Sequence, residues 1–355
     1  MEISTKFDTH LTKYTVRDFI ALAQRACDHG FGTLWLNDNV RYRNIFVVLP
    51  AVAAHVPITL GTAVLVQYFH QPVSLADTLA AMSELSTARE FKVGIGIGDI
   101  AQTPPYVDMI KPIAMLREMT LFLKQLFSGN TVYFRDFPTL THYYHLNPDG
   151  RHHLAFSPPR PLPFYGGSLG PQSLTTAGRY MDGVIFPAQF LALHRIGRFR
   201  AMLQRAEEAA KVTDEKKRFR FAVSVNVSVS HDGTKARRHV LPQVAHSIVS
   251  LTKLNLSHDE FEVLGIDPDR LQAIKQRFTE GGTIEEAAEL VDERMVNAYS
   301  LAGSPDEVWP ALTQLAKELR QFGVDELVLI RLGPDYAEAL DLLGEQVLPH
   351  LRSLS

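Results

Sequence analysis

The sequence predicts an α/β fold, a (β/α)8 or TIM barrel, and three observations carry this prediction. Strand and helix patterns alternate eight times along most of the 355 residues. The strand patterns are short and apolar, which is typical of buried parallel strands. Barrels of this class commonly reach this length as a single domain, so we expect residues 1–355 to form one domain. An open doubly wound sheet is the alternative that the same alternation allows.

The first third of the chain has clear helix and strand signals. Residues 15–29 space their apolar side chains by three and four, and the "GFGTLWL" that follows combines a stop glycine with a short strand. Ser74, with Asp77 three residues later, predicts a capping box at a helix start. The elements expected up to residue 128 are helices over about 15–29, 44–55, 74–85 and 111–128, and strands in "GFGTLWL", "ITLGTAV" and residues 91–97.

The strand over residues 91–97 poses a question, because its glycines alternate with aliphatic residues in "VGIGIGD". Glycine weakens a strand interior and usually marks a close approach of the backbone to another group. We therefore expect another group to lie against this strand.

The remaining chain contains one break in the alternation. Residues 129–160 are rich in Tyr, His and Pro without a clear period, which predicts an inserted segment. Residues 232–300 are mostly helical, and Ser304, Pro305 and Glu307 fit the N-cap, N1 and N3 positions of a later helix. The elements expected after residue 160 are strands in "LPFYGG", "DGVIF", "RFRFAVSVNVSVS" and "VDELVLIRLG", helices near 170–180 and 190–211 and in "GSPDEVWPALTQLAKELRQFG", and a final helix.

Composition argues against two classes of function. The formal net charge of −3 provides no basic footprint for nucleic acid. The histidines of "THYYHLNPDGRHHL" lack the Cys or Glu partners of an evident ligand set, so we predict no metal site. A small-molecule substrate is the partner that remains.

Compartment signals are consistent with one another. The apolar run over residues 45–66 is interrupted by Pro50, Pro57 and Gly61, which favours a buried helix and strand over a membrane span. The N-terminal "MEISTKFDTH" lacks the pattern of a signal peptide. The single cysteine, Cys27, suits a reducing compartment. We therefore expect a cytoplasmic protein without a membrane anchor.

Two stretches are candidates for ligand contacts, because the loops after barrel strands form the active site. Asn37, Asp38 and Asn39 follow a strand directly, where they contact a ligand or form an Asx-type turn. "YGGSLGPQSLTTAG", residues 165–178, is a strand end, a glycine-rich turn and a helix start. Free N–H groups and the helix dipole make such a junction suitable for a phosphate, although a plain tight turn explains the sequence as well.

The same stretches carry a family resemblance. The sequence resembles the bacterial luciferase-like flavin and deazaflavin proteins, and within them the branch that includes methylenetetrahydromethanopterin reductase, which uses coenzyme F420. The matching stretches occur in family order along most of the chain: "GFGTLWLNDNVRYRN", "ITLGTAVLVQYFHQPVSLADTLAAMSELSTAREFKVGIGIGD", "SGNTVYF", "YGGSLGPQSLTTAGRYMDGVI" and "AYSLAGSPDEV".

This resemblance implies a barrel with the 129–160 insertion over its C-terminal mouth, commonly a homodimer, with F420 as cofactor and FMN as the alternative. It implies that the glycine-spaced strand ends against the cofactor ring, that the "GGSLGP" turn holds the phosphate, and that the Ala63–Val64 bond is a cis peptide in a bulge beneath the ring. The implied cofactor-binding residues are Ala63, Val64, Gly96, Gly98, Gln102, Gly166, Gly167, Ser168, Gly170 and Pro171. The implied catalytic residues are Asp38, Asn39 and Asp99.

The function that this resemblance implies is an F420-dependent oxidoreductase that transfers a hydride between the deazaflavin and a small organic substrate. An FMN-dependent monooxygenase with a separate flavin reductase is one alternative, and a non-catalytic barrel is another. One difference between this sequence and the family affects all three of these functional hypotheses. Many F420-using relatives have a histidine after the strand-2 aspartate, where this chain has Asn39, and an amide cannot exchange a proton as an imidazole does.

Overall fold

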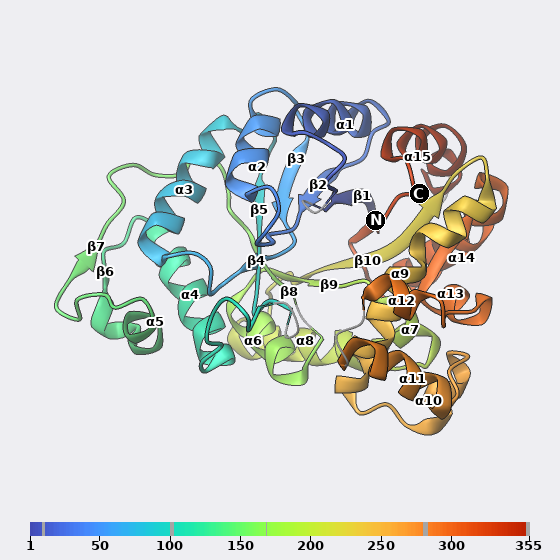
Figure 1. Cartoon of the computed structure of the whole chain (residues 1–355). Coiled ribbons are helices and arrows are strands. Elements are labelled where there is room, and N and C mark those ends of the chain that lie inside the picture. The colour runs from blue at the N-terminus through green and yellow to red at the C-terminus, as the bar shows by residue number, and fades with distance from the viewer. Residues whose placement is uncertain (9–10, 100–102, 168, 280–282, 353–355) are drawn as a thin grey trace.

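The computed structural model describes residues 1–8, 11–99, 103–167, 169–279 and 283–352. Parallel strands form a closed barrel that is surrounded by helices (Figure 1). The barrel strands are β1 (Glu2–Phe7), β2 (Thr33–Leu36), β3 (Thr59–Thr62), β5 (Phe91–Gly96), β8 (Phe164–Gly167), β9 (Gly183–Phe186), β10 (Arg220–Val229) and β12 (Glu326–Ile330).

The pairing of these strands shows the closure. β1 pairs with both β2 and β12, and β10 pairs with both β12 and β9, so the sheet closes on itself. The predicted (β/α)8 barrel is therefore confirmed, and the open doubly wound sheet is wrong. The additional strands of the described residues are β4 (Leu65–Val66) beside β5, β11 (Ser300–Gly303) beside β10, and the antiparallel pair β6 (Val132–Tyr133) and β7 (Arg151–His152).

Helices cover the outside of the barrel and fill the longer connections. They are α1 (Val16–Asp28), α2 (Ile45–Ala53), α3 (Pro72–Leu85), α4 (Pro112–Phe127), α5 (Pro138–Tyr143), α6 (Pro171–Tyr180), α7 (Phe190–Arg195), α8 (Phe199–Thr213), α9 (Gly233–Leu251), α10 (His258–Val263), α11 (Pro268–Thr279), α12 (Ile284–Ala288), α13 (Glu293–Tyr299), α14 (Pro305–Gln321), α15 (Tyr336–Leu342) and α16 (Leu348–Arg352). Three single turns accompany them, namely η1 (Phe134–Asp136), η2 (Thr252–Leu254) and η3 (Leu343–Val347). In the described part of the chain, no helix combines the length and apolar character needed to cross a bilayer.

Two capping predictions have opposite outcomes. The box at Ser304 is confirmed, since the Ser304 N–H donates to the Glu307 carboxylate at 2.7 Å at the start of α14. The box at Ser74 is wrong, because α3 already begins at Pro72. There the side-chain oxygen of Gln71 accepts from the Ser74 N–H at 2.8 Å. Proline at N1 and a capping side chain before it start the helix earlier than the sequence pattern predicts.

Side chains of the barrel strands divide into two cores. Outward-facing residues such as Phe7, Val93 and Leu329 pack in the large core between strands and helices. Inward-facing residues form a much smaller core inside the barrel. Its buried members are Trp35, Tyr165, Ile185, Ala188, Ala222, Val328 and Ile330, with Ala63 and Val64 packed against them.

The segment 129–160 is an ordered connection between α4 and β8. Figure 1 shows β6, β7 and α5 at the edge of the barrel beside α3 and α4. Glu118 of α4 accepts hydrogen bonds from the backbone of Thr139 and Leu140 at 2.8 and 3.0 Å. The hydroxyl of Tyr144 donates to the carbonyl of Gln67, directly after β4, at 2.5 Å. This hydrogen bond, together with the ring contact between Tyr143 and Tyr68, joins the segment to the C-terminal end of the barrel.

Candidate active site

The loops after the barrel strands meet at the C-terminal mouth, and α9 crosses this opening. His239 of α9 lies beside Asp8 and Arg331, which follow β1 and β12. Seven residues later, His246 Nε2 lies 3.2 Å from Asp99 Oδ2, after β5. Residues seven apart share one face of a helix, so α9 presents a histidine-bearing face to the mouth. The sequence analysis described this region only as helical.

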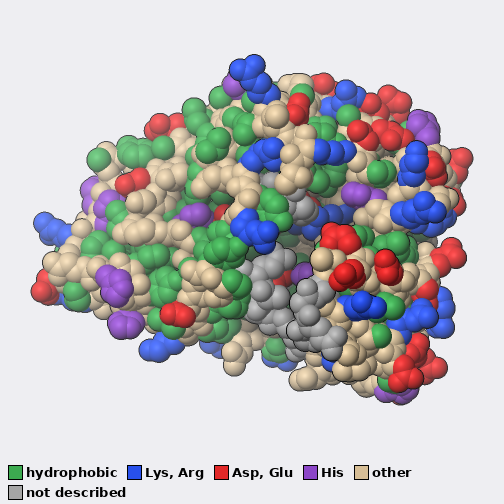
Figure 2. Space-filling view, in the orientation of Figure 1, with side chains coloured by type: hydrophobic (Ala, Val, Ile, Leu, Met, Phe, Trp, Pro, Cys, Tyr) green, Lys and Arg blue, Asp and Glu red, His purple; other side chains and the backbone are tan. Residues whose placement is uncertain are grey.

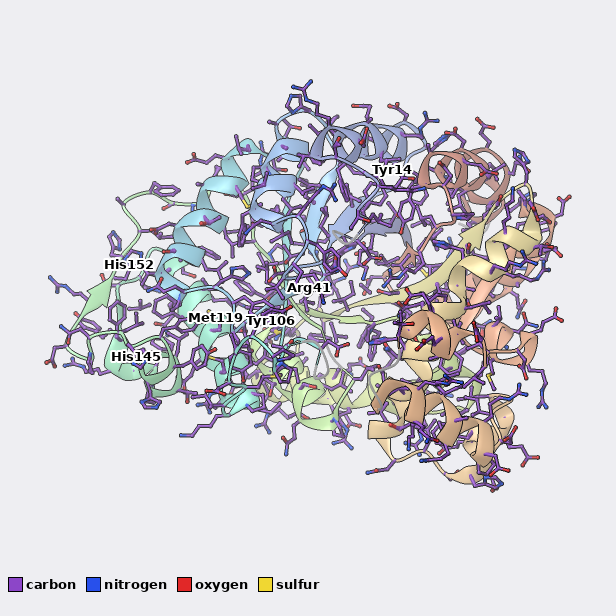
Figure 3. The ribbon with its side chains drawn as sticks, in the orientation of Figure 1. Tyr14, Arg41, Tyr106, Met119, His145 and His152 are labelled. Atoms are coloured by element: carbon purple, nitrogen blue, oxygen red, sulfur yellow. The ribbon has the colours of Figure 1, made fainter. Side chains whose placement is uncertain are left out.

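Two further views show the molecule in the orientation of Figure 1. Figure 2 shows charged and histidine side chains near the centre of the face in view. In Figure 3, Arg41 and Tyr106, from the segments after β2 and β5, lie near the centre of the view, whereas His145 and His152 lie at its edge. His145 and His152 therefore lie away from the centre of the view, where Arg41 and Tyr106 are. No group of three or more potential metal-binding side chains is found in the described residues.

Asp38 braces a bulge in the third barrel strand. Its N–H donates to the Val64 carbonyl at 3.3 Å, and its Oδ2 accepts from the Val66 N–H at 3.1 Å. The same Oδ2 lies 2.7 Å from His70 Nε2. Its side chain is only 8% exposed, so Asp38 acts here as a positioning residue for both the bulge and His70. Among the described residues, none forms a hydrogen bond with the Asn39 side chain.

The bulge itself contains the predicted cis peptide. The Ala63–Val64 bond is cis, as the family resemblance implies. The two residues separate β3 from β4 and pack against the interior core of the barrel. They place the Val64 side chain between neighbouring strands.

This side chain answers the question of the glycine-spaced strand. A Cβ at Gly94 would lie 1.9 Å from the Thr62 carbonyl oxygen, and one at Gly96 would lie 2.8 Å from Val64 Cγ2. At Gly98, with φ +85°, it would lie 2.5 Å from Thr103 Oγ1. The Cβ positions of these glycines therefore face other parts of the protein: Gly96 makes room for Val64 of the bulge, and Gly94 and Gly98 make room for Thr62 and Thr103. That this strand ends against a cofactor ring stays a prediction.

The predicted phosphate turn divides into residues with different roles. A Cβ at Gly166 would lie 2.7 Å from Ala177 Cβ, so this glycine permits close packing of α6 against β8. One at Gly167 would lie 2.5 Å from Val64 Cγ1, so this glycine also accommodates the bulge. Gly170 is the N-cap of α6 and Pro171 its first residue, and Gly170 has no side chain to cap the helix. Ser168 and Gln102 lie outside the described residues.

A charged cluster that the sequence analysis missed lies at the ends of β1 and β12. Lys6 Nζ is 3.4 Å from Asp8 Oδ1, and Arg331 Nη1 is 3.1 Å from Asp8 Oδ2. Asp8 is 1% exposed. Burial of His239, together with Arg331 and Lys13, lowers the pKa of this imidazole to about 4, against the opposing effect of Asp8. His239 is therefore neutral at pH 7.

Some of these missed residues had detectable signals. Lys6 and Asp8 follow the period of two in "EISTKFD", and the two α9 histidines are one heptad apart. His70 follows a predicted strand in "VLVQYFHQP". Polar residues after each strand, the N-terminal one included, would have indicated Asp8 and His70, whereas Lys6 lies within β1.

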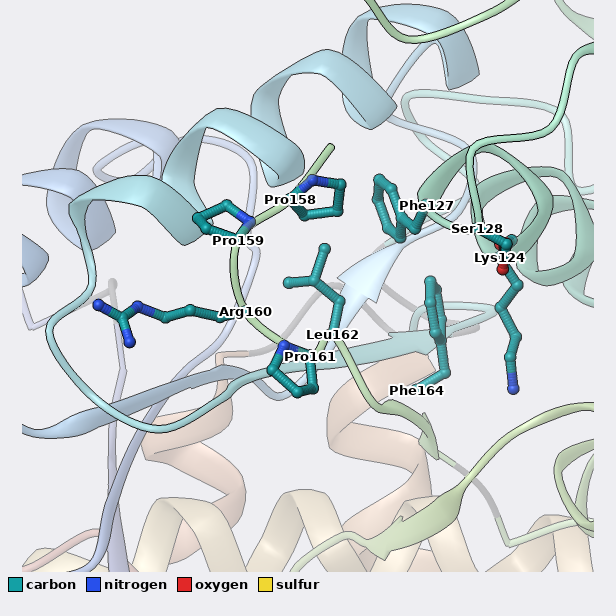
Figure 4. A pocket seen from close by; sticks show the side chains of 9 residues that line it. All are labelled: Lys124, Phe127, Ser128, Pro158, Pro159, Arg160, Pro161, Leu162 and Phe164. Carbon is teal, nitrogen blue, oxygen red and sulfur yellow. Dashed lines mark hydrogen bonds between the residues drawn. The ribbon is translucent and has the colours of Figure 1, made fainter. Parts of the chain in front are cut away.

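A surface pocket elsewhere is unrelated to the mouth. It is lined by Lys124, Phe127, Ser128, Pro158, Pro159, Arg160, Pro161, Leu162 and Phe164 (Figure 4). Phe127 ends α4 and Leu162 precedes β8, so this pocket lies at the N-terminal ends of the strands. Active sites of these barrels lie at the opposite end.

The fold and the residues at the mouth define the class of protein. It is a TIM barrel with a cis-peptide bulge after β3 and with aspartate–histidine pairs at its mouth. Residues 1–326 match the family described as luciferase-like monooxygenase. The chain therefore belongs to this family, which confirms the resemblance and makes the protein a member of an oxidoreductase family.

Individual relatives extend the comparison over the whole chain. The chain is 26% identical to the 5,10-methylenetetrahydromethanopterin reductase of Archaeoglobus fulgidus, over 99% of this chain and 100% of the relative. It is 24% identical to the F420-dependent glucose-6-phosphate dehydrogenase of Nakamurella multipartita, over 94% and 92%. The structure of the coenzyme F420-dependent tetrahydromethanopterin reductase from Methanopyrus kandleri matches with a TM-score of 0.74 at 24% identity, over 99% and 100%.

Proposed function

We propose that this protein is an F420-dependent oxidoreductase that transfers a hydride between the deazaflavin and a small organic substrate. The observation that carries the proposal is the contact between Val64 of the cis-peptide bulge and Gly167, at the end of β8 and just before α6. This contact places the apolar Val64, which could support a ring, beside the N-terminus of α6, which is suited to a phosphate. The F420-dependent activities named for similar proteins support the choice of F420 over FMN.

The N-terminus of α6 fits an anionic group of the cofactor. Its first-turn N–H groups receive no side-chain cap, because the N-cap is Gly170. The helix dipole also favours a negative charge at this end. Gly170 has room around it, since a Cβ there would meet only Ser173 Oγ, at 3.5 Å.

Two side chains beside the bulge, Asp38 and His70, supply a group that can exchange a proton. When bound, a deazaflavin supplies the ring carbon that exchanges the hydride. Asp38 Oδ2 accepts from His70 Nε2–H, so the other ring nitrogen, Nδ1, is not used in this contact. We assign to this Nδ1 the task of holding or releasing a proton at the mouth, a task that the amide of Asn39 cannot perform.

Two predictions from the sequence remain part of this proposal. The protein is proposed to form a homodimer. Residues 129–160 are proposed to restrict access to the mouth, since Tyr144 of this segment donates a hydrogen bond to the Gln67 carbonyl directly after β4.

The test of the cofactor is a titration of purified protein with F420 and with FMN, followed by fluorescence. We expect F420 to bind at least tenfold more tightly, about 1.4 kcal/mol. Equal or reversed affinities would contradict the proposal and favour the FMN-dependent monooxygenase. Asp38→Asn is expected to weaken binding of both cofactors, since it perturbs the bulge that either ring would use.

A further inference from the structure

We propose that Lys6, Arg331 and Ser228 form a subsite for an anionic group of the substrate, a carboxylate or a phosphate, at the β10–β12–β1 side of the mouth. The inference rests on the proposed function and adds a substrate class to it. This subsite is separate from the N-terminus of α6, which follows β8.

Lys6 points into the barrel. It is paired in register with Ile330 on β12 and with Trp35 on β2. Both partners have their side chains in the interior core, and register partners in a sheet share a face. The Lys6 side chain is 16% exposed, and Asp8 lies next to it on the same face of the chain, toward the mouth.

Arg331 reaches the same place by an unusual backbone conformation. Ile330, the last residue of β12, faces the interior, so strand alternation would point residue 331 outward. Arg331 instead has φ +61°, in the left-handed region that non-glycine residues seldom adopt. Its guanidinium lies 3.1 Å from the inward-facing Asp8 carboxylate and is 22% exposed. Residues in such conformations concentrate at functional sites.

Ser228 adds a buried polar group. It lies two residues beyond Asn226, which is paired with the inward-facing Ile330, so its hydroxyl is on the interior face of β10. Ser228 is fully buried, and its Oγ has no hydrogen-bond partner among the residues that the structure describes. A buried hydroxyl without a partner is uncommon in proteins, and an anion at this position would accept its hydrogen bond.

The charges of the mouth are divided between its two sides. On the β2–β5 side, each of Asp38 and Asp99 is paired with a histidine. On the β12–β1 side, Asp8 is paired with two cations, Lys6 and Arg331. These three side chains together carry a charge of +1. An anionic substrate group bound there would direct the rest of the molecule toward the bulge and His70.

The experiment uses protein saturated with F420, so that the position beside α6 is occupied. Inorganic phosphate and succinate are then titrated at constant ionic strength, and binding is measured by calorimetry. We expect saturable binding of at least one of these probes by the wild-type protein. Arg331→Met and Lys6→Met should each weaken it at least tenfold, and Ser228→Ala should weaken it about threefold.

Lys13→Met is the matched control. It removes the same charge nearby, but Lys13 is 49% exposed and donates to the Pro334 carbonyl at 2.6 Å. We expect a change of less than twofold. Equal losses in Lys13→Met and Arg331→Met would overturn the subsite, because they would show only a general charge effect. The subsite would also be overturned if Arg331→Met and Lys6→Met bound the probes as tightly as the wild type. If those two variants do not fold, the same conclusion follows from wild-type affinity in Arg331→Lys and Ser228→Ala.

Two further results separate this inference from the proposed function. If phosphate competes with F420, the subsite holds an anionic group of the cofactor, and the assignment to the substrate is wrong. If F420 does not bind at all, the same titrations are made on cofactor-free Gly170→Asp protein, in which the α6 position carries a negative charge. Loss of binding on Arg331→Met in that background would support the subsite while the proposed function fails.

Discussion

The barrel contains a charged cluster at each end, and the two are built differently. At the N-terminal end, Lys92 Nζ donates to Glu326 Oε2 and to Thr33 Oγ1, both at 2.8 Å, and Trp35 Nε1 donates to Glu326 Oε1 at 2.7 Å. Both charged side chains are 4% exposed. Burial alone would lower the pKa of Lys92, but Glu326 and Glu2 raise it to about 12. This cluster is closed and internally satisfied.

At the C-terminal end, the Lys6–Asp8–Arg331 cluster has an excess of positive charge and partly exposed cations. A nearby hydroxyl, Ser228 Oγ, has no partner among the described residues. The closed cluster contributes to stability, whereas the cluster at the C-terminal end is the one that we propose to bind an anionic group. The four predictions below test this contrast, in order of decreasing effect.

Lys92→Met should cause the largest loss of stability. It leaves the buried Glu326 carboxylate without its cation, which lowers the free energy of unfolding by about 3–5 kcal/mol. Arg331→Met should lose no more than about 1–2 kcal/mol, since Lys6 still faces Asp8. Urea unfolding measures both. The double variant Lys92→Met/Glu326→Gln should recover part of the loss, and equal losses in the two single variants would remove the distinction between the ends.

Gly170→Asp should separate stability from cofactor binding. An aspartate at this N-cap caps α6 and stabilises the cofactor-free protein by roughly a few tenths of a kcal/mol. The same carboxylate repels a phosphate at the helix N-terminus and should weaken F420 binding roughly tenfold to a hundredfold. Gly170→Asn caps the helix without the charge, so it should retain most of the affinity. If both variants bind F420 as the wild type does, the phosphate does not lie beside α6.

His239 should make the mouth sensitive to acid. Its pKa is about 4 in the folded protein, because of burial and of Arg331 and Lys13, with Asp8 opposing them. The unfolded chain has a histidine pKa of about 6.5, so it takes up the proton first as the pH falls. Stability due to neutral His239 is present above about pH 6.5 and is lost as the pH falls toward about 4, by about 1–2 kcal/mol. Between pH 7 and pH 4.5, the free energy of unfolding should decrease less in His239→Gln than in the wild type, as measured by urea unfolding. The same dependence of this free energy on pH in both proteins would refute the prediction.

The smallest effect concerns the 129–160 segment. If it restricts access to the mouth, F420 should slow hydrogen exchange of its amides around Tyr144 by a few-fold. The amides of β6 and β7, farther out, should change less. Tyr144→Phe removes the hydrogen bond to the Gln67 carbonyl and should abolish the effect of the cofactor on exchange. Equal exchange with and without cofactor would separate this segment from the mouth.

Several features follow from local sequence alone. Alternating strand and helix patterns predicted the barrel, and the Ser304–Glu307 pair predicted the start of α14. The turn before α6 was recognised from its glycines and proline, and its Gly170 is indeed an N-cap without a side chain. These features depend on hydrogen bonds and periodicities within a few residues, so the sequence contains them directly.

Other features depended on which distant segments meet. Gly96 of β5 and Gly167 of β8 were expected to contact a ligand, and the structure shows that both also make room for Val64 of the bulge between β3 and β4. His70 gains its role from Asp38, and the mouth-facing side of α9 is recognised only through Asp8, Asp99 and Arg331. The sequence by itself determined the alternation that closes into the barrel and the cap at Ser304, because those are set by short-range backbone geometry. Tertiary structure decided which side chains share the mouth, because closure of the barrel brings together residues more than three hundred positions apart, such as Asp8 and Arg331.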